Sequence, residues 1–239
     1  MKPYDTDQSK TEQVRDMFDR IAPTYDTLNH TLSLNVDRWW RRRTVDVVER
    51  LHPARILDIA TGTGDLAIAM AHRIPGARVT GVDPSEGMLD VARRKVAACG
   101  LDERIGFVTG SAEELAAGDA SFDAATVAFG VRNFGDIAAG LRQIARALRR
   151  GGSIVVLEFS TPSNPIVRWG YGIYSHRILP AIGGLVSRDR AAYRYLPESV
   201  DEFPAPERFL DIMREVGFDD CSARSLSFGI AHIYIGVKR

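Results

Sequence analysis

The stretch DIATGTGDLAIAMA, Asp58–Ala71, decides the fold. Just before its glycines, residues 55–60 have the apolar character of a buried strand, and the residues after the glycines have the composition of a helix. A strand that enters a glycine turn and then a helix presents backbone N–H groups to a nucleotide-like ligand. The sequence therefore predicts a nucleotide site here, with Gly62 and Gly64 allowing the ligand to approach the backbone closely.

Strands and helices alternate on both sides of this turn. Strands are predicted at 55–60, 78–82, 105–109, 122–129 and 153–159, and the intervening segments are helices at 65–73, 85–99 and 136–148 and a short turn at 112–117. Helices at 14–21 and 36–51 precede this region, and a helix at 206–216 and strands at 218–226 and 230–237 follow it. Such alternation implies βαβ crossovers, so we expect an α/β fold with a doubly wound, mostly parallel seven-stranded sheet.

The length of 239 residues suits one large α/β domain and is short for two. Within a single domain, 1–239, we expect N-terminal helices (1–52), a cofactor-binding core (53–160), a substrate lid (161–203) and a C-terminal helix with a strand pair (204–239). The lid is inferred because Pro162 and Pro165 open an aromatic, glycine-containing stretch that breaks the alternation.

The charge balance argues against a nucleic-acid substrate. The chain has 31 Lys and Arg against 31 Asp and Glu, so no overall field gathers polyanions. The densest basic patch is WWRRR, residues 39–43. Aromatic rings beside arginines suit RNA or anionic lipid headgroups, but the patch can equally be the solvated cationic face of a helix.

Nothing in the sequence predicts a membrane span or a secretory signal. The residues Met1–Thr11 are polar, and no apolar run approaches the roughly 18 to 20 residues of a spanning helix. We therefore expect a cytoplasmic protein. Cys99 and Cys221 lie far apart without metal-ligand spacing, so we expect two buried thiols and no metal site.

The glycines alone leave the identity of the nucleotide open. The run Gly62–Ala67 also fits the loose pattern of a dinucleotide-binding dehydrogenase. Asp83, about twenty positions later, can accept ribose hydroxyl protons from either ligand. Asp58 and Asp65 would repel a pyrophosphate but suit the ammonium and sulfonium of S-adenosylmethionine, which we therefore expect as the cofactor. Alternatively, Asp58 only caps the turn and Asp65 only favours the helix N-terminus.

The order of elements and several motifs resemble a known family. The arrangement is similar to that of class I S-adenosylmethionine-dependent methyltransferases, and most closely resembles the C-methyltransferases of menaquinone and ubiquinone biosynthesis. The matching motifs are YDTLNHTLS (25–33) with Trp40, FGVRN (129–133), RALRRGG (146–152) leading to LEFS (157–160), and YRYL (193–196) with Ser199.

The resemblance implies that cofactor contacts fall on Thr63, Asp83 and the pair Ser111 and Ala112. This chain departs from the family pattern at several positions. Asp37 stands where the family usually has histidine, and Ala128 stands where a serine can bond to the cofactor. Residues 147, 149 and 150 also differ from the usual turn.

The implied reaction is transfer of a methyl group to a ring carbon of a prenylated quinol, and we expect demethylmenaquinol to give menaquinol. A benzoquinol of ubiquinone biosynthesis is the alternative. Outside this family, the rival readings are a methyltransferase for RNA or another small molecule, a nicotinamide dehydrogenase, and a cofactor-binding scaffold without catalysis. A peripheral contact with the inner face of the membrane and a homodimer are both left open.

Arg132 and Asn133 follow the fourth predicted strand and are the candidate catalytic residues. A sulfonium is already electrophilic, so the enzyme must align the ring carbon and favour the anionic form of the neighbouring hydroxyl. A fixed guanidinium favours that anion, and Asn133 can orient the hydroxyl or a water that accepts its proton. Alternatively, Arg132 merely pairs with a carboxylate.

The substrate-binding candidates are Tyr25, Tyr193, Tyr195 and His176. The tyrosines can line the ring pocket or pack in the core, and a histidine has a suitable pKa for a proton acceptor. Glu158 ends the fifth strand and can contact substrate or stabilise the lid. Apolar residues in the range 166–186 suit an amphipathic element along the prenyl tail and the bilayer surface, or a buried cover helix.

Overall fold

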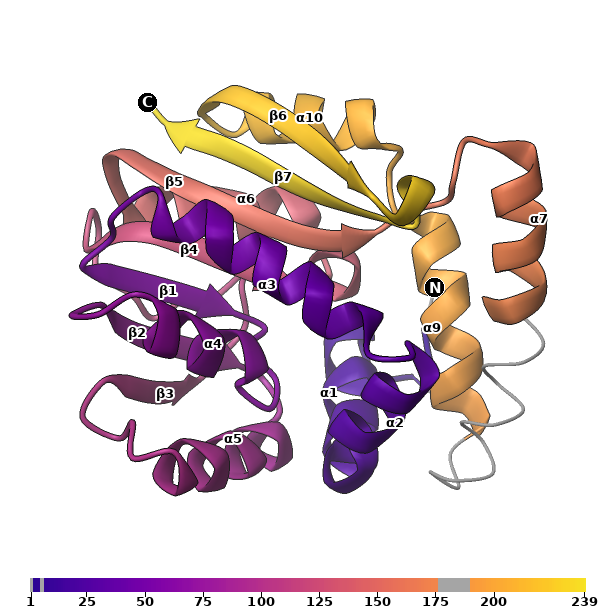
Figure 1. Cartoon of the computed structure of the whole chain (residues 1–239), viewed down its shortest axis with the longest axis horizontal. Helices are drawn as coiled ribbons and strands as arrows, with labels where there is room; N and C mark the ends of the chain where they lie inside the picture. The colour runs from indigo at the N-terminus through magenta and orange to yellow at the C-terminus, as the bar shows by residue number, and fades with distance from the viewer. Residues whose placement is uncertain (1, 5–6, 176–189) are drawn as a thin grey trace.

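The structure is a computed structural model that describes residues 2–4, 7–175 and 190–239. Its centre is a seven-stranded sheet with strand order β3-β2-β1-β4-β5-β7-β6 (Figure 1). The strands are β1 (Arg55–Ile59), β2 (Arg78–Asp83), β3 (Ile105–Thr109), β4 (Phe122–Ala128), β5 (Leu148–Phe159), β6 (Phe218–Leu226) and β7 (Ala231–Lys238). Only the pairings of β7 with β5 and β6 are antiparallel. The predicted fold class is confirmed.

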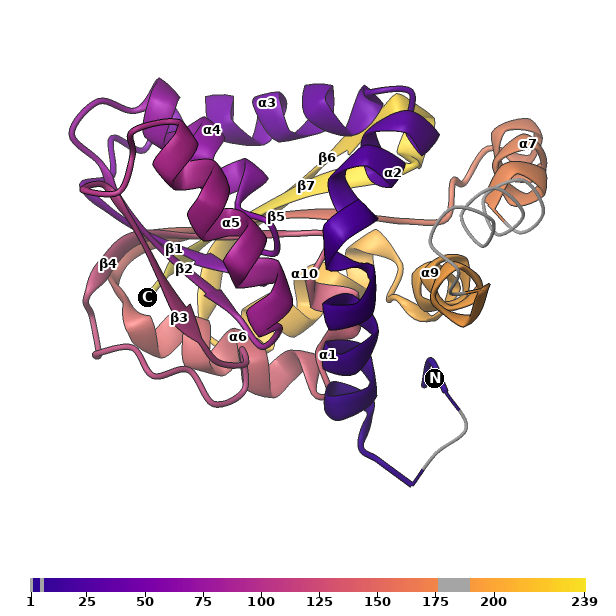
Figure 2. The ribbon, with the colours of Figure 1, turned by 90° about the horizontal axis from the view of Figure 1, so that it is seen from below.

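Helices cover both faces of the sheet. The helices of the described residues are α1 (Lys10–Ile21), α2 (Tyr25–Leu32), α3 (Val36–Glu49), α4 (Asp65–Arg73), α5 (Glu86–Ala98), α6 (Ile137–Ala147), α7 (Pro165–Ile173), α9 (Arg190–Glu202) and α10 (Pro206–Glu215). Figure 2 shows α3 and α4 on one face and α6 and α10 on the other. Trp40, Val48 and Met70 fill the core on the first face, and Leu141 and Phe209 fill the second. Burial of these apolar side chains holds the layers together.

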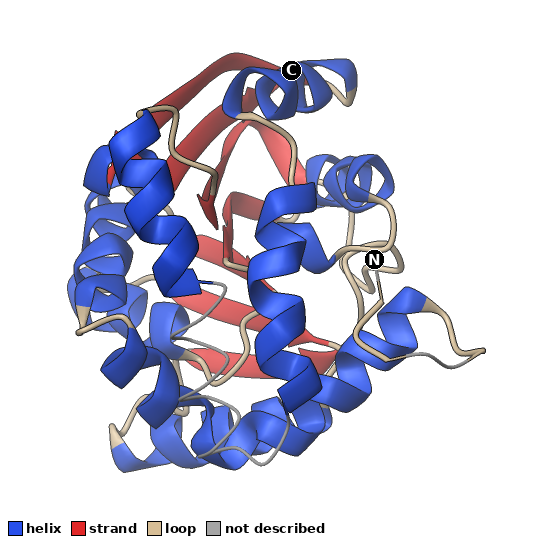
Figure 3. Cartoon of the chain, turned by 90° about the vertical axis from the view of Figure 1, so that its right-hand side faces the viewer, coloured by secondary structure: helices blue, strands red, loops and turns tan. Residues whose placement is uncertain are grey.

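A third group of helices lies beyond the carboxyl ends of the parallel strands, the side that faces the viewer in Figure 3. Here α1, α2 and α9 share a small core with the start of α5, and this core includes Met17, Leu28, Met88 and Tyr195. A capping box between Ser9 and Glu12, which satisfies free N–H groups at the helix start, begins α1. Ligands of doubly wound sheets bind at this end, so these helices frame the site.

The structure differs from the expected elements in two places, while the turn expected at 112–117 is observed. Helix α2 was not predicted, because Leu28 is its single buried residue and gives no apolar period. Strand β5 begins at Leu148, before the expected position 153, because a register shift in its pairing with β4 absorbs the intervening polar and glycine residues.

Smaller expectations can also be compared with the structure. Cys99 is exposed and Cys221 is half-buried, so the prediction of two buried thiols was wrong. No helix within the described residues is long and apolar enough to cross a bilayer. Helices α7 and α9 occupy the described part of the predicted lid, whose role remains a prediction, as does the division of the chain into four parts.

Candidate active site

Two cavities open at the carboxyl ends of the strands. The strand-end cavity lies beside the glycine turn and is lined by residues that include Gly62, Asp83, Ser111, Ala112, Ala128 and Asn133. The apolar cavity has a volume of about 390 Å³ and is lined by residues that include Trp40, Arg41, Arg132, Phe159, Tyr171 and Tyr174. Tyr25 and Phe129 line both cavities, so the two spaces meet at these side chains.

The glycine turn is held next to the end of β2. Gly62 and Gly64 both have positive φ, at 56° and 80°, a conformation that glycine adopts without steric cost. The N–H of Gly62 donates to Asp83 Oδ2 at 2.8 Å, and the N–H of Ser85 donates to Asp83 Oδ1 at 2.9 Å. The Asp83 carboxylate is therefore fixed at the wall of the strand-end cavity.

Asp58 is buried between two hydroxyl groups. It accepts hydrogen bonds from Thr61 Oγ1 at 2.6 Å and from Thr126 Oγ1. Burial raises the pKa of Asp58 to about 6, and burial likewise raises the pKa of Asp83 to about 6. Because both carboxyls are shielded from water, ionising them costs free energy. Carboxyls with raised pKa values of this kind are common at functional sites.

The segment after β4 packs tightly against the end of β1. A Cβ added to Gly130 would lie 2.5 Å from the Cβ of Ala60, closer than real carbon atoms approach. Glycine is therefore required at this position, and it lets the segment that leads to Arg132 and Asn133 pass directly beside Ala60 at the end of β1. The motif FGVRN is in this way a structural as well as a chemical unit.

Arg132 forms a buried ion pair. Its Nη1 donates to Glu158 Oε1 at 2.6 Å and to the carbonyl of Phe129 at 2.6 Å, and its Nε donates to Ser199 Oγ at 3.2 Å. Burial by itself would lower the pKa of Arg132, but the charge and hydrogen bond of Glu158, together with the nearby Tyr25 and Tyr195, outweigh burial and raise the pKa. The alternative of a carboxylate partner is thus observed, while Arg132 also lines the apolar cavity beside the Phe159 ring.

The other candidate residues are distributed around this centre. The hydroxyl of Tyr195 donates to Asn133 Oδ1 at 3.1 Å, and Tyr195 is buried in the core, where burial raises its pKa to about 12. Burial also raises the pKa of Tyr25. Tyr193 lies in α9, but its side chain and the whole of His176 lie outside the described part of the chain.

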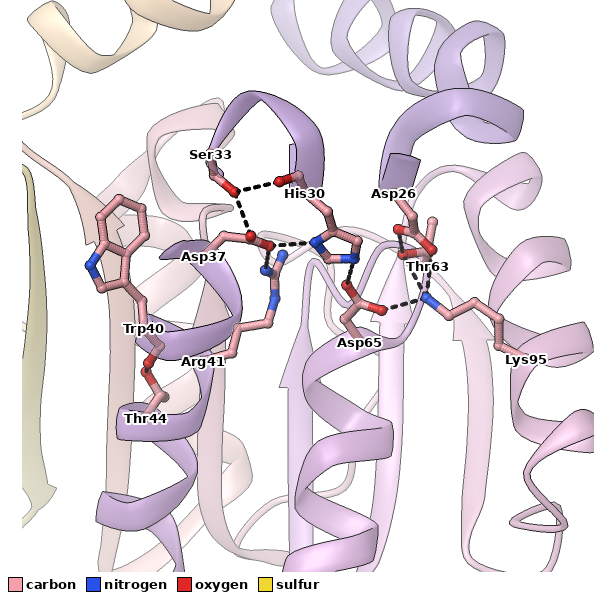
Figure 4. A network of polar contacts seen from close by, with 10 residues as sticks. All are labelled: Asp26, His30, Ser33, Asp37, Trp40, Arg41, Thr44, Thr63, Asp65 and Lys95. Carbon is pink, nitrogen blue, oxygen red and sulfur yellow. Dashed lines mark hydrogen bonds and ion pairs between the residues drawn. The ribbon is translucent and has the colours of Figure 1, made fainter. Parts of the chain in front are cut away.

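A polar network beneath α2 was not predicted from the sequence. Figure 4 shows His30 and Asp26 of α2 in contact with α3, α4 and α5. Thr63 Oγ1, an expected cofactor contact, donates to Asp26 Oδ1 at 2.5 Å. Ligand atoms of Asp26, His30 and Asp65 lie close enough together to hold a metal ion, but the ammonium of Lys95 bonds to both carboxylates. That ammonium already compensates their charge.

Two structural features explain why the sequence did not reveal this network. Its central residue, His30, lies on the helix that lacks an apolar period. The basic patch at 39–43 is divided between environments, because Trp40 is buried, Arg41 joins the network, and Trp39 is partly exposed beside Arg43. A signal was present in Asp37, the departure from the family pattern, which bonds to His30, Ser33 and Arg41.

A doubly wound sheet closed by an antiparallel pair, with a carboxylate at the end of β2 beside a glycine turn, is the arrangement of the class I methyltransferases. Residues 6–238 match the sequence model of the ubiE/COQ5 methyltransferase family. The chain belongs to this family of enzymes, as the motifs led us to expect, and the prediction of S-adenosylmethionine as methyl donor is confirmed with it.

Full-length relatives carry related names. The chain is 44% identical to a demethylmenaquinone methyltransferase of Bacteroides fragilis, covering 100% of this chain and 97% of the relative. It is 48% identical to a protein of the same name from Thermus thermophilus, covering 92% and 99%. It is also 46% identical to a ubiquinone/menaquinone biosynthesis C-methyltransferase, UbiE, of Geobacter sulfurreducens, covering 96% and 90%.

Solved structures of lower identity share the fold. A S-adenosylmethionine-dependent methyltransferase of Thermotoga maritima, described as a possible histamine N-methyltransferase, superposes with a TM-score of 0.68 at 20% identity, covering 94% of this chain and 99% of that one. The [4+2]-cyclase SpnF gives 0.70 at 17% identity, covering 95% and 96%. Such neighbours with different activities establish the fold alone.

Proposed function

We propose that this enzyme transfers the methyl group of S-adenosylmethionine to a ring carbon of a prenylated quinol, converting demethylmenaquinol to menaquinol. The observation that carries the proposal is the junction of the two cavities at Tyr25 and Phe129. A space that carries the Asp83 carboxylate on its wall suits the donor, and an adjoining apolar space of about 390 Å³ suits a naphthalene ring and the first part of its tail. The names of the full-length relatives support the same substrate.

The donor binds in the strand-end cavity. The Asp83 carboxylate accepts hydrogen bonds from the ribose hydroxyls. The backbone at Gly62 and Gly64 leaves room for the methionine part of the ligand. Asp58 and Thr63 stabilise that turn, Asp58 supplying negative charge below the ammonium of the donor. Ser111 and Ala112 lie beside the base. These roles place the sulfonium near Tyr25, at the passage to the apolar cavity.

The acceptor ring lies in the apolar cavity with one carbon facing the sulfonium. In the reaction the neighbouring hydroxyl gives its proton to solvent water, a bond forms between the ring carbon and the methyl group, and the sulfur–methyl bond breaks with its electrons on sulfur. The ring carbon then loses its proton to solvent water while the oxygen regains one, which restores the aromatic quinol with one proton released overall. Arg132 favours the anionic form of the quinol hydroxyl, and its pairing with Glu158 keeps the guanidinium fixed in position. Asn133, held by Tyr195, orients the hydroxyl or a water that accepts its proton.

The same proposal includes a peripheral contact with the cytoplasmic face of the membrane, where a prenylated quinol resides. Leu34 and Phe228 are each 84% exposed, and both have positive φ, which is rare for bulky residues. Leu34 lines the apolar cavity, as does Ser227, which precedes Phe228. Exposed Ile166 and Trp169 of α7 add apolar surface. Exposed apolar side chains beside such a cavity suit insertion into a lipid surface, from which the substrate can enter.

The proposal is tested by mixing the enzyme with labelled S-adenosylmethionine and chemically reduced demethylmenaquinone in a single turnover, then identifying the methylated carbon. We expect label on the quinone ring carbon. A demethylated benzoquinol of the ubiquinone series and bulk RNA are assayed in parallel. Faster labelling of the benzoquinol would move the substrate to that series, and labelling of RNA alone, or of nothing, would refute the proposal.

A further inference from the structure

A chain of charged side chains with alternating sign runs from the apolar cavity to the glycine turn (Figure 4). Four helices contribute to it: α2, α3, α4 and α5. From the apolar cavity to the glycine turn, the charged side chains in contact are, in order, Arg41, Asp37, His30, Asp65, Lys95 and Asp26. Opposite charges in direct contact, partly shielded from water, polarise and fix one another.

His30 occupies the middle of this chain. Its Nδ1 lies 2.8 Å from Asp37 Oδ2, and its Nε2 lies 3.4 Å from Asp65 Oδ2. A neutral imidazole has one donor and one acceptor nitrogen, whereas an imidazolium has two donors. Since both nitrogens face carboxylate oxygens, the imidazolium is the form that satisfies this geometry. Its side chain is only 15% exposed, so water competes weakly for these contacts.

The two ends of the chain reach the two cavities. Arg41 lines the apolar cavity, with its guanidinium carbon 5.4 Å from the centre of the Phe129 ring. At the other end, Asp26 accepts a hydrogen bond from the hydroxyl of Thr63 in the glycine turn. Asp26 and His30 belong to α2, the helix that begins with Tyr25. These contacts therefore fix α2, whose first residue, Tyr25, lines both cavities.

We propose that His30, as an imidazolium, is a positioning residue that holds α2 on the glycine turn and so keeps both cavities closed around their ligands. The groups that face it are Asp37 and Arg41 of α3, Asp65 of α4, Lys95 of α5 and Asp26 of its own helix. Replacement of His30 by an uncharged side chain leaves Asp37 and Asp65 without the cation between them, and the contacts that hold α2 are weakened.

The test measures the dissociation constant of S-adenosylmethionine by calorimetry at one fixed pH. We expect His30→Gln to bind about tenfold more weakly than the wild type, within the range of coupling through such contacts. His30→Arg, which keeps the charge, should bind about as tightly as the wild type. His72→Gln, the same change at an exposed histidine of α4, should follow the wild type.

Hydrogen exchange of the amides in Tyr25–Leu32 supplies a readout that does not depend on ligand. Exchange should be faster in His30→Gln than in His72→Gln, with equal exchange in α10. If His30→Gln and His30→Arg have equal affinities, or if His30→Gln keeps the affinity of the wild type, the proposal is overturned. Only donor binding is measured, so failure of the quinol assay is a separate result.

Discussion

Arg132 Nη1 lies 2.6 Å from Glu158 Oε1, both side chains are buried, and Arg132 lines the apolar cavity. An ion pair removed from water stabilises a fold less than its short distance suggests, because both charges lose their hydration. Its value here is geometric. The pair fixes a guanidinium from an element that follows β4 against a carboxylate at the end of β5, so the position of the cation does not depend on the substrate.

The first prediction concerns Arg132→Ala. We expect the turnover rate to fall by about 10²- to 10³-fold, the usual cost of removing one fixed donor from a developing anion. The affinity for S-adenosylmethionine should change little, because Arg132 lines the other cavity. The melting temperature should also fall, since Glu158 is left buried without its partner. Turnover equal to that of the wild type, measured below the melting temperature, would exclude Arg132 from the mechanism.

The second prediction concerns the pH dependence of stability. The pKa of Asp58 is raised by burial to about 6, above its ordinary value of about 3.9. A carboxyl of this kind favours the folded state below its ordinary pKa, and that contribution, about 3 kcal/mol, is lost as the pH rises through about 6. Asp58→Asn should therefore raise the melting temperature at about pH 7.5 and leave it nearly unchanged at about pH 4.5.

The same variant should bind S-adenosylmethionine more weakly, because the negative charge below the donor is removed. Calorimetric melting at both pH values, with donor binding measured at the higher one, checks this trade between stability and function. A lower melting temperature for Asp58→Asn at the higher pH would contradict the assigned cost of burial.

The third prediction concerns Ala128, which lines the strand-end cavity where the family can have a serine. Ala128→Ser should tighten the binding of S-adenosylmethionine by about two- to tenfold, the usual net value of one neutral hydrogen bond. Ala98→Ser, at the exposed last residue of α5, is the matched control and should leave the dissociation constant unchanged. Equal affinities in all three proteins would mean that residue 128 makes no polar contact with the donor.

The fourth prediction concerns the exposed apolar side chains of Leu34 and Phe228. The double change Leu34→Ser and Phe228→Ser should reduce the fraction of protein that co-sediments with anionic vesicles by about tenfold. It should slow the methylation of a long-tailed quinol held in those vesicles by about the same factor. Methylation of a short-tailed, soluble quinol should be nearly unchanged. Val108→Ser removes an exposed apolar side chain on β3 and should have no effect. Unaltered sedimentation of the double variant would locate the lipid contact elsewhere.

Local sequence determined most of the fold and much of the donor site. The apolar strands, the glycine turn after Asp58 and the acidic residue at the end of β2 can be recognised in the chain because each depends on neighbouring residues or a fixed spacing. The structure places Gly62, Asp83, Ser111 and Ala112 around one cavity, as their positions at strand ends imply. What each residue contributes to binding is still a prediction.

The acceptor side was decided by tertiary structure. Nothing in the spacing of residues shows that Glu158 lies against Arg132, that Tyr195 packs in the core and bonds to Asn133, or that His30 lies between two carboxylates. These contacts join elements that are distant in sequence, and the short helix α2 is stabilised by packing and ion pairs with its neighbours, with little contribution from an apolar period of its own. The sequence by itself determined which elements form and which chemistry they carry. Only the packing of α2, α3 and α9 over the strand ends decided which charges meet, because those contacts are set by the arrangement of the helices in space.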